Sequence, residues 1–169
     1  VNNPELAEGG EGGKISRQAS GMCIDFPAND PTVYFVGTEN NTIHKCSCSY
    51  NEQYLVNYTG HAGPVYKVKC SPFVPEVFLS CGADWTVKLW TEAEERPLLS
   101  FMSVDLTDVV HDVAWSPGNG TVFGYTTGDG RVELWDLMKN TLDPVVSHAP
   151  EPTEWLDDEG SEAGDGAGA

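Results

Sequence analysis

Basic residues are scarce in this chain. Its 169 residues include only 9 Lys and Arg against 26 Asp and Glu, which gives a formal net charge of −17 at pH 7. Proteins that bind phosphate backbones or anionic lipid surfaces do so with clustered Lys and Arg. Because the few basic residues here are scattered along the chain, we expect neither nucleic acid nor a membrane as a direct partner.

Long apolar runs are also lacking. No segment approaches the roughly 20 apolar residues that a membrane-spanning helix requires. The first residues do not contain the charged region and apolar run that mark a secretory signal. We therefore expect a protein of the cytoplasm.

The cysteines do not form a recognisable framework. Five is an odd number for a secreted protein with paired disulfides; the residues are Cys23, Cys46, Cys48, Cys70 and Cys81. A zinc site made from the last four would not have the usual Cys-x-x-Cys spacing. We expect buried, reduced thiols that behave as small apolar side chains.

Catalytic motifs are missing as well. The sequence has no phosphate-binding loop, dinucleotide-binding glycine motif, zinc-protease motif or calcium loop. His61, Ser80 and Asp84 are the residue types of a serine hydrolase, but a nucleophilic Ser needs a strained turn and an oxyanion hole. Ser80 lies instead in the plain apolar run of residues 78–81. We expect no enzyme, and no cofactor, metal or small-molecule substrate.

What the chain does contain is an internal repeat of about 45 residues, the blade period of WD-repeat propellers. The segments that match at an offset of 45 are residues 70–72 with 115–117, 77–80 with 122–125, Asp84 with Asp129, and 87–90 with 132–135. A weaker copy, residues 33–46, matches at an offset of 44. Each copy has short runs rich in Val, Phe, Tyr and Trp between Gly, Pro, Asn and Asp, which is typical of strands and tight turns.

The repeat predicts an all-β fold made of WD-repeat β-propeller blades. We expect about three four-stranded antiparallel blades within residues 21–150, with approximate limits of 21–50, 51–95 and 96–140. Three blades cannot close a ring, since propellers typically have about four to eight. The propeller is therefore incomplete, and its first and last blades are expected to expose an apolar face each.

The two ends differ from the repeats. Residues 1–20 are rich in Gly and Glu, and residues 151–169 are acidic, rich in Gly and Ala, and low in complexity. Such segments bury too little apolar surface to order themselves, so we expect disordered tails. Trp155 has the surroundings of a short linear motif, but the favoured interpretation is a solvated tail with one aromatic residue.

Four residues of the middle repeat predict a structural relay of hydrogen bonds. The indole N–H of Trp90 would donate to Ser80, the Ser80 hydroxyl would reach His61, and Asp84 would hold the imidazole. Such a relay pairs several buried donors and acceptors at once, as a folded interior requires. It would join the second and third strands of the blade and leave no reactive group free.

The last repeat keeps only part of this set. Asp129 and Trp135 correspond to the Asp and Trp of the relay, but Leu106 or Thr107 stands where His61 would be. Without an imidazole the relay cannot close there, so we expect this blade to be the less rigid one.

Trp85 is the candidate partner contact. It follows the Asp of the middle repeat in a turn, where a large aromatic side chain has no obvious core to fill. Trp is also among the residues that dominate binding energy at protein interfaces. The alternative is that Trp85 packs against a neighbouring blade.

Several motifs resemble one protein family. Residues 84–90 (DWTVKLW) are similar to the characteristic blade of dynein intermediate chains, and residues 37–39 (GTE) to the preceding blade of the axonemal members. Residues 44–55 (HKCSCSYNEQYL) and 63–68 (GPVYKV) most resemble the intermediate chain of the two-headed inner dynein arm, with outer-arm intermediate chains next. The resemblance covers roughly residues 14–144.

The resemblance implies a non-catalytic scaffold subunit of an axonemal, inner-arm dynein motor complex. Such a subunit binds a dynein heavy chain through its propeller, supports cilium movement and belongs to the cytoskeleton of the cilium or flagellum. In the family, light chains bind a segment that precedes the propeller. That segment and further blades are lacking in this sequence, so light-chain binding is not carried over and we expect a fragment of a longer product.

A generic WD-repeat adaptor, such as a substrate receptor of a ubiquitin ligase, is the alternative. Such receptors carry an Arg two residues after a Trp-Asp pair. Here Trp135-Asp136 is followed by Leu137-Met138, and residues 91–93 after the middle repeat contain no Arg either. The sequence therefore favours the dynein scaffold.

Overall fold

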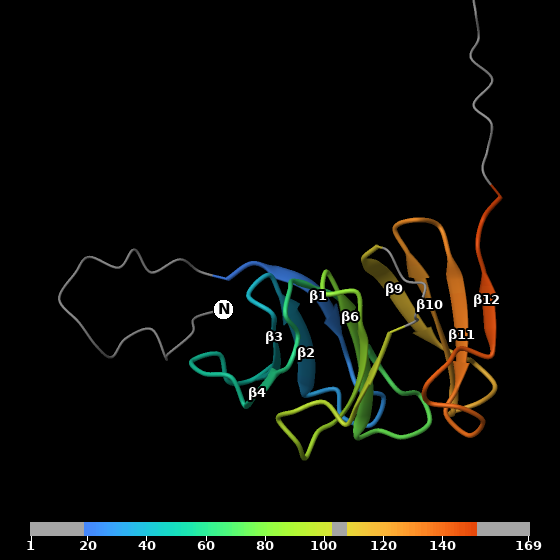
Figure 1. The fold of residues 1–169 in the computed structure, drawn as a ribbon. Helices are drawn as coiled ribbons and strands as arrows, with labels where there is room; N and C mark the ends of the chain where they lie inside the picture. The colour runs from blue at the N-terminus through green and yellow to red at the C-terminus, as the bar shows by residue number, and fades with distance from the viewer. Residues whose placement is uncertain (1–18, 103–107, 152–169) are drawn as a thin grey trace, which may run out of the picture.

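The computed structural model describes residues 19–102 and 108–151. In these ranges the chain is all-β, and its twelve strands form three four-stranded antiparallel sheets (Figure 1). This confirms the predicted all-β fold of WD-repeat blades. None of the described residues belongs to a helix long and apolar enough to span a membrane. The predicted disorder of residues 1–20 and 151–169, like Trp155, falls almost wholly outside the described ranges.

The strands follow one another in chain order within each sheet. The first sheet contains β1 (Gly21–Asp25), β2 (Val33–Thr38), β3 (Thr42–Ser47) and β4 (Val56–Thr59). The second contains β5 (Val65–Cys70), β6 (Val77–Gly82), β7 (Val87–Thr91) and β8 (Leu99–Phe101). The third contains β9 (Val110–Trp115), β10 (Val122–Thr127), β11 (Val132–Asp136) and β12 (Val146–His148).

The sheets end later in the chain than the blades expected from the sequence. β4 pairs with β3 through Lys45 and Val56, so it belongs to the first sheet and not to the middle one. The sheets thus span residues 21–59, 65–101 and 110–148, in place of 21–50, 51–95 and 96–140. The reason is that a sequence repeat gives the length of the repeating unit but not the residues at which each sheet begins and ends.

The second sheet lies between the other two (Figure 1). Its two faces pack against two separate clusters of buried side chains, because successive residues of a strand point to opposite faces. Toward the first sheet the cluster contains Phe35, Ile43, Tyr58, Val65, Val68, Phe78 and Trp90. Toward the third it contains Leu79, Cys81, Val87, Leu89, Phe101, Val110, Val113, Phe123, Tyr125 and Trp135. Burial of each large side chain contributes about 1.5–3 kcal/mol.

The two outer faces of the stack differ. On the third sheet, Val132, Leu134 and Val146 are 40%, 39% and 51% exposed, so the predicted apolar face is present there. On the first sheet, the outward-facing His44 is buried, and the ring of Tyr54 from the β3–β4 loop stacks on it with 3.7 Å between ring centroids. The β3–β4 loop therefore helps to cover the first blade, which the sequence pattern did not predict.

Candidate functional site

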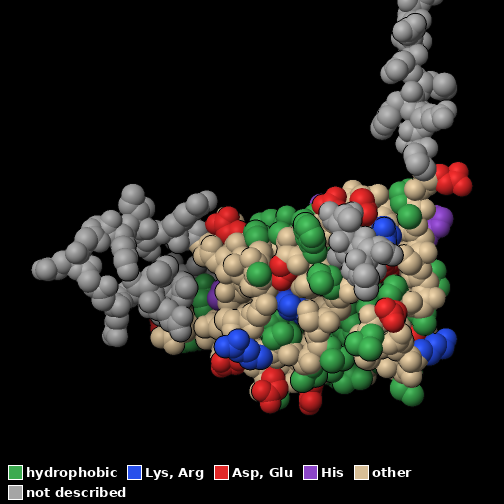
Figure 2. All heavy atoms as spheres, viewed as in Figure 1, with side chains coloured by type: hydrophobic (Ala, Val, Ile, Leu, Met, Phe, Trp, Pro, Cys, Tyr) green, Lys and Arg blue, Asp and Glu red, His purple; other side chains and the backbone are tan. Residues whose placement is uncertain are grey.

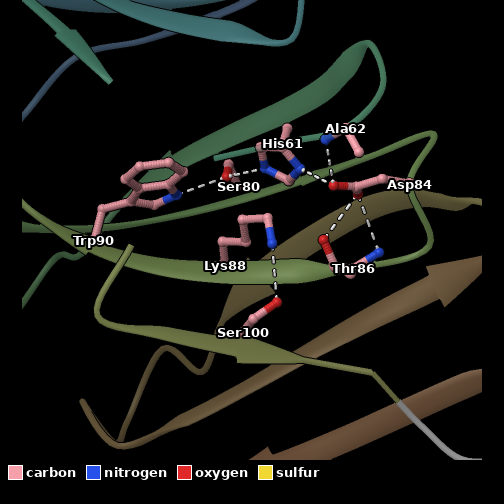
Figure 3. A network of polar contacts seen from close by, with 8 residues as sticks. All are labelled: His61, Ala62, Ser80, Asp84, Thr86, Lys88, Trp90 and Ser100. Atoms are coloured by element: carbon pink, nitrogen blue, oxygen red, sulfur yellow. Dashed lines mark hydrogen bonds and ion pairs between the residues drawn. The ribbon is translucent and has the colours of Figure 1, made fainter. Parts of the chain in front are cut away.

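The structure brings the four predicted relay residues together in the middle blade (Figure 3). Ser80 lies on β6, Trp90 on β7, Asp84 in the turn between them, and His61 in the loop between β4 and β5. The Trp90 Nε1–H donates to Ser80 Oγ at 2.8 Å. His61 Nε2 lies 2.6 Å from Ser80 Oγ, and His61 Nδ1 lies 2.9 Å from Asp84 Oδ2.

A neutral imidazole satisfies every donor and acceptor of this chain. With its proton on Nδ1, His61 donates to the Asp84 carboxylate and accepts the Ser80 hydroxyl proton at Nε2. The Ser80 oxygen in turn accepts the Trp90 N–H. All donors point the same way, from the indole to the carboxylate, so the relay closes without an unpaired group.

The same three residues have the connectivity of a Ser-His-Asp triad, but their surroundings do not suit catalysis. Ser80 is fully buried, and one lone pair of its oxygen is already occupied by Trp90. The His61 side chain has no exposed surface either. A nucleophile must reach its substrate beside an oxyanion hole, and this geometry instead encloses Ser80 in the interior.

Asp84 links the relay to two segments of backbone. Its Oδ2 accepts the Ala62 N–H at 3.0 Å, and its Oδ1 accepts the Thr86 N–H and hydroxyl at 3.2 and 2.8 Å. Burial opposes ionisation of this carboxyl, but the hydrogen bond from His61, together with the Ala62 and Thr86 bonds, holds its pKa below the ordinary value. The carboxylate therefore fixes the β4–β5 loop against the β6–β7 turn.

In the third blade the structure does not join Asp129 to Trp135. Asp129 accepts the Thr127 hydroxyl and the Arg131 N–H within its own turn. The Trp135 Nε1–H is buried and has no hydrogen-bond partner within the described part of the chain. Leu106 and Thr107, the residues expected at the position of His61, lie outside the described residues.

Two buried charged residues were missed by the sequence analysis. Lys88 on β7 donates to Ser100 Oγ at 3.0 Å, and Glu133 on β11 accepts from Ser147 Oγ at 3.1 Å. Both pairs sit in the same register, with the Ser directly across on the outermost strand of each sheet. Residues two apart on a strand point to the same face. Because each charged residue lies two positions before an inward-pointing Trp, this alternation would have identified both as buried.

Trp85 is at the surface in the β6–β7 turn, where 43% of it is exposed. It is part of neither buried cluster. Its backbone has a positive φ of 65°. The arrangement leaves the indole accessible to another molecule.

The cysteines show no metal-binding arrangement. All five are free thiols, with Cys46 and Cys81 buried and Cys48 exposed. No group of three or more His, Cys, Asp or Glu that could hold a metal ion occurs among residues 19–102 and 108–151.

Comparison with known proteins finds similarity to dynein intermediate chains. The family model of the dynein axonemal intermediate chain 3 WD40 domain matches residues 32–150. Dynein axonemal intermediate chain 4 of Mus musculus is 53% identical over 138 residues, which are 82% of this chain and 17% of the relative. Dynein intermediate chain 2, ciliary, of Heliocidaris crassispina is 40% identical over 143 residues, 84% of this chain and 20% of the relative.

A third relative extends the range of organisms. The 78 kDa dynein intermediate chain of the flagellar outer arm of Chlamydomonas reinhardtii is 39% identical over 137 residues, 78% of this chain and 20% of the relative. The chain thus spans about a fifth of the length of these relatives. Because the family match covers most of the chain and its residues fold into WD-repeat blades, the chain belongs to the axonemal dynein intermediate chain family.

Proposed function

We propose that this chain is a non-catalytic scaffold segment of an axonemal dynein motor complex. It binds a dynein heavy chain and other dynein subunits through the surfaces of its blades and supports cilium movement. The chain is a component of the axoneme, as its ciliary and flagellar relatives indicate. The family match over residues 32–150, which form the blades themselves, is the observation that carries this proposal.

The middle blade supports a scaffold role over a catalytic one. The groups of His61, Ser80 and Asp84 are used in hydrogen bonds that join a loop, a strand and a turn. A rigid blade of this kind presents its loops in fixed positions, which lowers the entropic cost of binding a partner. A fluorophosphonate probe should therefore leave Ser80 unlabelled, and labelling of Ser80 in the folded protein would contradict the non-catalytic role.

We further propose the inner dynein arm as the location. The support is the similarity of residues 44–55 and 63–68 to the intermediate chain of the two-headed inner arm.

Affinity purification from ciliated cells tests both proposals. The tagged chain should recover dynein heavy chains, and those of the inner arm should exceed those of the outer arm. A Gly82→Ala variant, in which a new methyl group would clash with the β4–β5 loop and destabilise the middle blade, provides a control for capture that does not depend on an intact blade. Recovery of cullin-type scaffolds without dynein subunits would reject the motor assignment and favour a ubiquitin-ligase adaptor. Recovery of outer-arm heavy chains alone would reject only the inner-arm location.

A further inference from the structure

We propose that the end of the blades that carries Trp85 is the docking surface for a positively charged segment of the dynein heavy chain, with Trp85 as its anchor. This inference rests on the proposed function and adds to it the surface, the anchoring residue and the charge of the partner. Three observations carry it: the backbone of Trp85, the bonds on either side of it, and the charge of the surrounding loops.

The first observation is that Trp85 occupies a position that the fold reserves for other residue types. The same turn position of the three blades is filled by Asn41, Trp85 and Gly130, at the offsets of 44 and 45 that relate the repeats. All three have positive φ, at 67°, 65° and 84°. Gly adopts such left-handed backbone readily and Asn tolerates it, whereas a bulky side chain there is a rare exception.

Packing inside the molecule does not explain this exception. Trp85 is 43% exposed and lies outside both buried clusters, so much of its apolar surface faces solvent. Disfavoured backbone conformations are retained chiefly at sites of function. An indole in this turn is therefore explained by a contact that the isolated chain does not make.

The second observation is that the relay holds Trp85 in place. The preceding residue, Asp84, is bonded to His61 and Ala62, and the following residue, Thr86, donates both its N–H and its hydroxyl to Asp84 (Figure 3). The backbone on both sides of the indole is thus fixed before any partner arrives. Such preorganisation strengthens binding because less freedom is lost on association.

The third observation is the charge around Trp85. This end of the blades is formed by four connections, β2–β3, β4–β5, β6–β7 and β10–β11, and by the segments before β1, before β9 and after β12. Backbone hydrogen bonds join neighbouring segments, for example Ala83 N–H to Pro64 O and Gly128 N–H to Val109 O. The charged residues described there are Glu39, Asp84, Asp108, Asp129, Glu151 and Arg131.

Acidic groups therefore outnumber basic ones at this end. Acidic side chains are visible along the upper edge of the molecule in Figure 2, where these loops lie, as well as along its lower edge. With a formal net charge of −17 on the whole chain, a basic partner segment is favoured and an acidic one is repelled. Lys or Arg side chains of that segment would also interact favourably with the face of the indole.

The test uses the full chain and an immobilised dynein heavy-chain tail. Trp85→Asn introduces the residue that the first blade has at this turn. Leu142→Asn is the control, because Leu142 is an exposed apolar residue of the β11–β12 connection at the opposite end of the blades. Affinity is measured by biolayer interferometry at about 50 mM and about 300 mM salt, with melting temperatures in parallel. Trp85→Asn should weaken binding at least about tenfold while it keeps or raises the melting temperature. Leu142→Asn should leave the affinity unchanged, and the higher salt concentration should weaken binding of the wild type.

Two results would overturn the inference. One is wild-type affinity of Trp85→Asn, and the other is a fall in its melting temperature as large as that of Trp90→Phe, which would make Trp85 a packing residue. If the wild type does not bind the heavy-chain tail at all, the proposed function fails separately. In that case a Lys-rich peptide is titrated against the wild type and Trp85→Asn. Weaker binding of the peptide by Trp85→Asn supports the proposed docking surface, and equal binding or no binding rejects it.

Discussion

Trp90 and Trp135 are equivalent residues of neighbouring blades, yet among the described residues only Trp90 has a partner for its indole N–H. Trp90 donates to Ser80 Oγ at 2.8 Å, while the Trp135 N–H is buried and unpaired within the described part of the chain. Tyr125 occupies the position of Ser80 in the third blade, and its hydroxyl donates to the buried Glu133 instead. Within residues 19–102 and 108–151, the complete relay is thus found in the middle blade.

The first prediction compares Trp90→Phe with Trp135→Phe. Both residues are fully buried, so both substitutions lose similar apolar area. Trp90→Phe also removes a hydrogen bond from Ser80, whereas Trp135→Phe removes an N–H to which no described residue is bonded. We expect the free energy of unfolding to fall by about 2 kcal/mol more for Trp90→Phe. Urea denaturation measures this difference, and equal losses in the two variants would show that the relay adds no stability.

The second prediction concerns Asp84 and pH. Because the pKa of this carboxyl is lower in the folded chain than in the unfolded chain, its contribution to stability is present above about pH 4 and is lost as the pH falls through the folded pKa. The unfolding free energy of the wild type should therefore fall more steeply on acidification than that of Asp84→Asn. The gap between the two proteins should be widest near neutral pH. Parallel profiles from chemical denaturation between pH 3 and pH 7 would contradict the charge-based role of Asp84.

The third prediction concerns two glycines with opposite surroundings. A Cβ at Gly82 would clash with the backbone oxygen of Pro64, so the β4–β5 loop that carries His61 would have to move. A Cβ at Gly118 would meet no atom within 4 Å. We expect Gly82→Ala to destabilise the fold by about 2 kcal/mol or more, and Gly118→Ala to be neutral or slightly stabilising. Thermal unfolding measures both, and similar melting temperatures for the two variants would show that the loop yields without cost.

The fourth prediction concerns the reactivity of the thiols. Burial, with the charge of Asp112 as a smaller contribution, raises the pKa of Cys81 far above its ordinary value. Burial and the nearby Asp25 raise the pKa of Cys70 to about 12. At about pH 8, where an ordinary thiol is partly ionised, iodoacetamide should modify the exposed Cys48 first. Peptide mapping by mass spectrometry checks the order of modification, with the urea-unfolded chain as the control in which all sites react. Rapid labelling of Cys81 in the folded chain would show that β6 opens to solvent.

The strands and the relay residues were accessible to sequence reasoning for a physical reason. Alternation of apolar and polar residues follows directly from the pleat of a strand. The geometry that WD-repeat blades share fixes the sequence spacing of His61, Ser80, Asp84 and Trp90. The limits of the sheets were not accessible, because β4 could pair with β3 or precede β5 without any change in the local sequence. Only the hydrogen bonds between strands decide between these two assignments.

The sequence by itself determined that this chain forms antiparallel blades with a period of about 45 residues, since strand alternation and turn residues are local properties of the chain. Tertiary structure alone decided which face of each sheet is covered. It also decided that Lys88 and Glu133 have Ser partners in the interior, and that no described residue accepts the N–H of the third-blade Trp135. These outcomes depend on side chains that meet from distant parts of the chain, and the same is true of the left-handed backbone that holds Trp85 at the surface.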